Sequence, residues 1–139
     1  MGCCQTSSKL PERFSFAGTW DAKVINIIDG DTFDACFVFY GTEWIFRVRI
    51  AGVDTPEMHP KRKGLTLDEI KEIKINAKKA KDALETYIGG KRVKLIVNAP
   101  EKFGRVLAHV YYNNKDVADF LIINKYGVAY DGKKKSLKG

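Results

Sequence analysis

The sequence predicts one domain of the α+β class, mainly β: a closed five-stranded barrel with a helix inserted after the third strand and a second, short helix. Three observations predict this fold. Five short runs have strand-like apolar character, turn residues separate them, and only two segments have helical spacing. The chain has 139 residues, which is enough for one hydrophobic core and too few for two.

The first three strands are expected to form a meander at residues 20–28, 32–40 and 43–51. Turn residues at 29–30 (DG) and 41–42 (GT) separate them and favour hairpins. In the third strand apolar side chains alternate with Arg47 and Arg49, which therefore share the outer face.

The long helix is expected to begin after Thr66 and to end near residue 88. Thr66 and Glu69 have the spacing of a capping box, and a pair of glycines follows the last apolar position. The predicted core face consists of Ile70, Ile73, Ala77, Ala80, Leu84 and Ile88. The other face carries Lys71, Lys74, Lys78 and Lys81, as a solvated surface or as phosphate contacts. Strands at 92–98 and 105–112 and a short helix at 116–126 complete the prediction.

The composition indicates a basic globular protein. Lys and Arg number 24 against 17 Asp and Glu, a net charge of +7, and hydrophobic residues make up 45%. The hydrophobic content argues against global disorder. The charge favours polyanionic partners, nucleic acid or an anionic membrane, although it also fits a purely solubilising role.

The cysteines show no zinc-binding spacing, and no run of residues resembles a signal peptide or a membrane span. An intracellular location is expected.

Both ends of the chain are set apart from the predicted domain at 19–130. Residues 1–18 have the composition of a flexible arm, and residues 131–139 form a basic tail. The arm begins MGCCQT, which matches the pattern for myristoylation of Gly2 and places Cys3 and Cys4 for palmitoylation. Two acyl chains would anchor the protein stably to the cytoplasmic face of a membrane. A chance match of six residues is the alternative.

Three motifs carry residues suited to phosphodiester chemistry. They are residues 29–32 (DGDT), 49–57 (RIAGVDTPE) and 102–105 (KFGR), each at a predicted strand end or loop. Carboxylates and carbonyls are the ligands that calcium and magnesium prefer, and arginines bind phosphate through a planar fork. Each motif alone also fits an ordinary turn or a surface charge.

Taken in order and spacing, the three motifs resemble those of the staphylococcal-nuclease family, over about residues 20–130. The resemblance implies an OB-fold barrel and a calcium-dependent endonuclease that hydrolyses DNA and RNA with little sequence preference. It further implies the site residues, by role: Asp31, Asp54 and the Thr55 carbonyl as metal ligands, Arg49 and Arg105 on the scissile phosphate, Glu57 as general base or water-positioning group, and Lys102 and Phe103 in substrate binding.

The chain departs from the family pattern at two places. Phe103 replaces the usual tyrosine, which removes a hydroxyl, and the family's C-terminal helix is not evident after Tyr130. No protein partner is inferred. The rival hypothesis is a non-catalytic OB-fold module that binds nucleic acid, which would not require the carboxylates and arginines to occur together.

Overall fold

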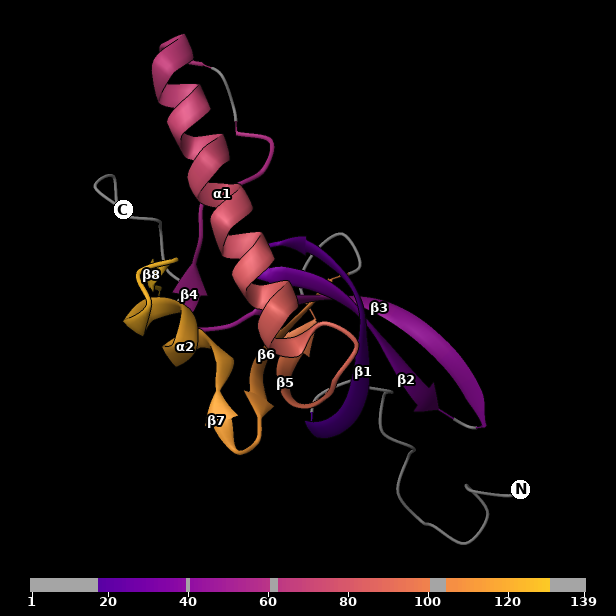
Figure 1. The fold of residues 1–139 in the computed structure, drawn as a ribbon. Helices are drawn as coiled ribbons and strands as arrows, with labels where there is room; N and C mark the ends of the chain where they lie inside the picture. The colour runs from indigo at the N-terminus through magenta and orange to yellow at the C-terminus, as the bar shows by residue number, and fades with distance from the viewer. Residues whose placement is uncertain (1–17, 40, 61–62, 101–104, 131–139) are drawn as a thin grey trace, which may run out of the picture.

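The computed structural model describes residues 18–39, 41–60, 63–100 and 105–130, which form a barrel flanked by two helices (Figure 1). In chain order the elements are β1 (Gly18–Asp29), β2 (Thr32–Phe39), β3 (Thr42–Ile50), β4 (Val53–Asp54), α1 (Leu67–Ile88), β5 (Arg92–Pro100), β6 (Arg105–Tyr112), β7 (Lys115–Asp116), α2 (Val117–Ile123) and β8 (Val128–Ala129).

Five strands close the barrel in the order β3-β2-β1-β5-β6. Neighbours along this order are antiparallel, and β3 and β6 then pair in parallel, with Val48 opposite Val106. This last pairing leaves neither strand as a free edge of the five-stranded sheet. The predicted fold class, a mainly β barrel of five strands with two helices, is confirmed.

The core follows the period-two alternation of the strands. On β5, Val93, Leu95 and Val97 are buried, while the side chains between them are exposed. Phe33 and Phe37 of β2 are the largest fully buried side chains of the barrel. Each buried side chain of this size contributes about 1.5–3 kcal/mol to folding, so the alternation fixes which face of each strand points inward.

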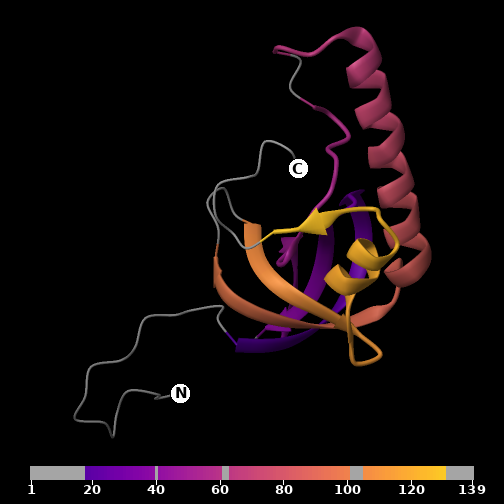
Figure 2. The same ribbon diagram turned by 90° about the vertical axis from the view of Figure 1, so that its left-hand side faces the viewer.

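Helix α1 begins with the predicted capping box. The Thr66 hydroxyl accepts a hydrogen bond from the Glu69 amide, and the Glu69 carboxylate accepts one from the Thr66 amide. Of its buried residues, Leu84 and Ile88 near the C-terminal end join the main core cluster, and the partly buried Tyr87 packs against it. The N-terminal half extends beyond the barrel (Figures 1 and 2). None of the helices in the described part of the chain is long and apolar enough to cross a membrane.

The structure differs from the sequence-based prediction at element ends and in three short strands. The first strand begins two residues earlier, at Gly18, because it pairs with β5 as far as Val97. The second helix covers Val117–Ile123 instead of 116–126, because Asp116 is its N-cap and Asn124 is its C-cap. Strands β4, β7 and β8 contain two residues each, which is too short for any periodic pattern.

Candidate active site

The candidate site lies where the β1–β2 turn, the end of β3 and strand β4 meet. Gly30 in the turn packs against α1 and against the loop after β4. A Cβ atom at this position would lie 2.6 Å from the Ala80 Cβ and 2.9 Å from the Thr55 hydroxyl oxygen. Glycine is therefore the residue that lets the turn approach this closely, and the approach brings Asp31 next to the β4 segment.

Arg49 is the centre of the cluster. Its Nη1 lies 3.4 Å from Asp31 Oδ2, and its Nη2 lies 3.4 Å from Asp54 Oδ1. Nη1 also donates to the carbonyls of Ile50, at 2.9 Å, and Val53, at 2.8 Å. The Arg49 side chain is only 13% exposed, so these contacts hold the guanidinium in one position between two carboxylates.

Asp31 also links the turn to the loop. Its Oδ2 accepts a hydrogen bond of 3.0 Å from the Thr55 amide, and its Oδ1 accepts one of 3.0 Å from the Thr32 hydroxyl. Two residues before Asp31, Asp29 accepts a hydrogen bond of 3.1 Å from the Met58 amide. Asp31 thus joins the first two motifs, and Asp29 joins the turn to the residue that follows the second motif.

Strand β8 holds Asp54 from the other side, a contribution that the sequence motifs did not reveal. Asp54 pairs with Val128, and the Tyr130 amide donates to the Gly52 carbonyl at 3.1 Å. Gly127 lies so close to strand β4 that a Cβ atom on Gly127 would be 2.9 Å from the Asp54 carbonyl oxygen. The sequence signal for this contact is weak, because a glycine after a helix is ordinarily explained by helix termination alone.

The Tyr130 ring adds a second contact that sequence reasoning missed. Its centroid lies 5.7 Å from the Arg49 Cζ, within the range of a cation–π interaction. The aromatic residue near the end of the described chain therefore helps to fix the arginine at the centre of the site.

The other predicted residues are distributed around this cluster. Glu57 is exposed in the loop, three residues after Asp54. Arg105 begins β6, where the parallel register places it beside Arg47, and since paired residues share a face, it lies on the face of Arg49 too. Lys102 and Phe103 lie outside the described residues.

Arg47, which shares this face, is engaged elsewhere. Its Nε donates to Asp34 Oδ1 at 2.9 Å, its Nη2 donates to Asp34 Oδ2 at 3.3 Å, and the side chain is 47% exposed. The hydrogen bond with Asp34 raises the pKa of Arg47 above its ordinary value. Arg47 thus forms a two-bond surface ion pair, whereas Arg49 faces two carboxylates in the buried cluster.

The chemistry of the cluster fits a hard divalent cation. Asp31 and Asp54 supply two carboxylates, 10% and 13% exposed, that approach the same guanidinium. The Thr55 hydroxyl oxygen is a buried polar atom without a hydrogen-bond partner next to them. Over the described ranges, no group of three or more His, Cys, Asp and Glu side chains is arranged to hold a metal. The remaining ligands would therefore be backbone oxygens, such as the Thr55 carbonyl, and water.

Comparison with known proteins gives two similarities. The family model described as "Staphylococcal nuclease homologue" matches residues 47–138. The uncharacterized protein MJ1439 of Methanocaldococcus jannaschii is 32% identical over 106 residues, which cover 68% of this chain and 49% of that protein. The matched part of the chain thus spans about half the length of this relative.

Proposed function

The chain belongs to the staphylococcal nuclease homologue family, and from that membership we propose that it is a calcium-dependent endonuclease of low sequence specificity that hydrolyses phosphodiester bonds of DNA, RNA or both. One observation carries the proposal for this chain: Arg49 contacts both Asp31 and Asp54, which come from different motifs. A solubilising surface charge would not require an arginine to be enclosed between two carboxylates.

In this proposal Asp31, Asp54 and the Thr55 carbonyl would hold a calcium ion, which would neutralise phosphate charge and polarise a water molecule. Arg49 is fixed by the carbonyls of Ile50 and Val53, so its position does not depend on the substrate. Donors placed in advance in this way stabilise charge that develops in a transition state at little cost of reorganisation.

The remaining roles follow from exposure and placement. Arg105 would donate to a second oxygen of the same phosphate from the neighbouring strand. Glu57 is exposed and can reach solvent, so it would orient the attacking water or accept its proton. Lys102 and Phe103 would contact the next phosphate and its nucleoside.

The test is cleavage of plasmid and single-stranded DNA, and of RNA, by the purified protein in calcium and in chelator. We expect calcium to support cleavage and chelator to abolish it, because two carboxylates and an arginine cannot replace the charge of a divalent cation on the phosphate. Binding of nucleic acid without cleavage under any condition would instead favour the non-catalytic module. Full cleavage in chelator would contradict the metal site.

We also propose an intracellular location and membrane attachment through Gly2, Cys3 and Cys4, which lie outside the described residues. The proposal rests on the acylation pattern at the N-terminus. In a eukaryotic cell, Gly2→Ala is expected to move most of the protein from the membrane to the soluble fraction, because stable attachment requires two acyl chains. Fractionation measures this, with nuclease activity as the control that should not change. Wild-type protein that is already soluble would contradict the anchor.

A further inference from the structure

Helix α1 and the loop after β4 enclose an open hollow of about 600 Å³. Its surface is mostly apolar, and Met58 of the loop and Ile75 of the helix contribute to it. Ile75 is 56% exposed in the middle of a helix, on the face turned away from the barrel core. Lys74, Lys78 and Lys79 stand on the rim. The hollow thus combines an apolar floor with a cationic border.

Basic and acidic side chains lie on different sides of the N-terminal half of α1. At about 3.6 residues per turn, Lys71, Lys74 and Lys78 fall within roughly 60° of arc, and the acidic residues of the first two turns fall on the neighbouring side. The described helix brings one acid to the hollow's rim, Asp82, whose Oδ2 lies 3.3 Å from Lys78 Nζ. Both side chains are more than half exposed, so this pair is weak and a polyanion can compete for the lysine.

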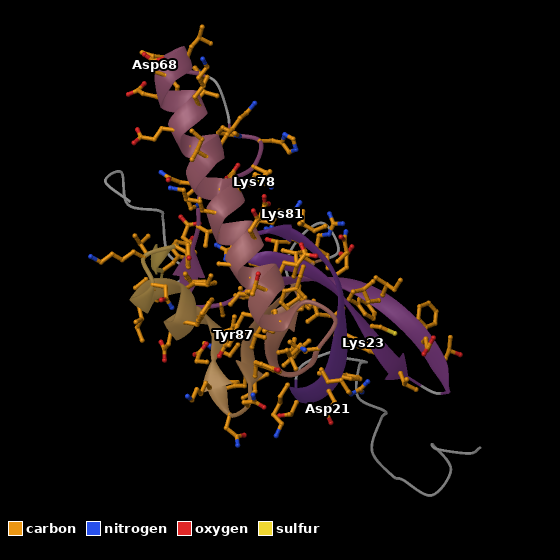
Figure 3. The ribbon with its side chains drawn as sticks, viewed as in Figure 1. Asp21, Lys23, Asp68, Lys78, Lys81 and Tyr87 are labelled. Atoms are coloured by element: carbon orange, nitrogen blue, oxygen red, sulfur yellow. The ribbon has the colours of Figure 1, made fainter. Side chains whose placement is uncertain are left out.

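The hollow adjoins the candidate active site. The segment after β4 rises alongside α1 (Figure 1). Gly30 of the β1–β2 turn lies next to both Ala80 of α1 and Thr55, so the site lies at the level of Ala80 along the helix axis. Met58, which lines the hollow, follows Glu57 in the chain, and its amide donates to Asp29 of the β1–β2 turn. Figure 3 shows Lys78 and Lys81 on neighbouring turns of α1 at this level, with Lys23 further down on the barrel.

We propose that this hollow extends the substrate site and binds an unpaired base of a single-stranded nucleic acid, with flanking phosphates on Lys74 and Lys78. The inference rests on the proposed nuclease function and specifies its substrate. An apolar floor can receive a base only if the base is not stacked inside a duplex, and lysines on the rim match the phosphates on either side of it. A membrane would need a wider apolar face than Ile75 and Leu67 provide on this helix.

The test compares Lys74→Glu/Lys78→Glu with Lys23→Glu/Lys94→Glu, an exposed pair on the barrel wall that changes the net charge equally. In chelator, the first variant should bind a fluorescent oligothymidylate at least about tenfold more weakly than the control variant. The slope of log K against log salt should be smaller in magnitude for this variant than for the control variant by about 1.4, since two phosphate contacts to a single strand are lost. Ile75→Ser should reduce the preference for single-stranded over duplex DNA roughly fivefold.

Binding measured in chelator separates this inference from the proposed function, because it does not require cleavage. Failure of wild-type protein to cleave any substrate would refute the nuclease, yet binding of the oligothymidylate would still decide the role of the hollow. Equal binding by the two double variants overturns the inference. So does a selective loss, in Lys74→Glu/Lys78→Glu, of binding to phosphatidylserine vesicles but not to the oligothymidylate.

Discussion

Arg49→Lys is expected to lower kcat by a factor on the order of 10²–10³, the usual cost of removing one positioned donor from a charged transition state. An ammonium group cannot contact Asp31 and Asp54 while also donating to the carbonyls of Ile50 and Val53, as the guanidinium does. The same loss should destabilise the fold by about 1–3 kcal/mol, because buried acceptors lose their donor. Steady-state kinetics at a temperature well below unfolding, together with urea denaturation, separates the two effects.

Arg47→Lys is the matched control, since Arg47 lies two residues away on the same strand face. Its ion pair with Asp34 is solvent-exposed, and such pairs contribute about 0–1 kcal/mol, so both kcat and stability should remain close to wild type. Equal losses of activity in the two variants would show that any guanidinium on this strand face, and not the position of Arg49, supports cleavage.

Substitutions of Asp31, Asp54 and Glu57 are expected to impair the enzyme in different ways. Asp31→Ala and Asp54→Ala should raise the calcium concentration needed for half-maximal activity as well as slow turnover, because the affinity of a hard cation depends on ligand charge. Asp31→Ala should also be less stable, since the Thr55 amide loses its acceptor. Glu57→Gln should lower kcat by about 10²–10⁴ with little change in calcium affinity, as expected for loss of a general base. Calcium titrations of the cleavage rate measure all three.

Because Glu57 is exposed, its substitution provides the cleanest test of a chemical role. The free energy of unfolding of Glu57→Gln should match that of the wild type, so lost turnover could not be attributed to misfolding. A fully active Glu57→Gln protein would remove the base from the mechanism and leave the water to be oriented by other groups.

Elements with strong local signals were predicted from the sequence, and pairings between distant short segments were not. The capping box of Thr66 and Glu69 and the alternation along β5 depend on near neighbours, and the structure confirms both. The β4–β8 pairing joins two dipeptides, and a dipeptide has no period to detect. The contacts of Tyr130 with the site depend on that pairing, so they could not be predicted either.

The candidate site was predicted in part. Motif order and spacing indicated that Asp31, Arg49 and Asp54 belong together, and the structure places them in one cluster. Spacing alone did not indicate that Arg49 would be held by the carbonyls of Ile50 and Val53, because those bonds depend on how the chain bends between β3 and β4. It also did not indicate the exposed hollow beside Ile75, which requires the loop and α1 to run side by side.

Because Asp54 pairs with Val128, the environment of this candidate metal ligand depends on a strand near the end of the domain. During synthesis, Asp31, Arg49 and Asp54 leave the ribosome long before Val128, and β3 must also wait for β6 before the barrel closes. A nascent or truncated chain that ends before β8 contains Asp31, Arg49 and Asp54, but it lacks the strand that pairs with Asp54 and the Tyr130 ring beside Arg49. Such a chain would therefore carry the motifs without the contacts that β8 and Tyr130 add to the site.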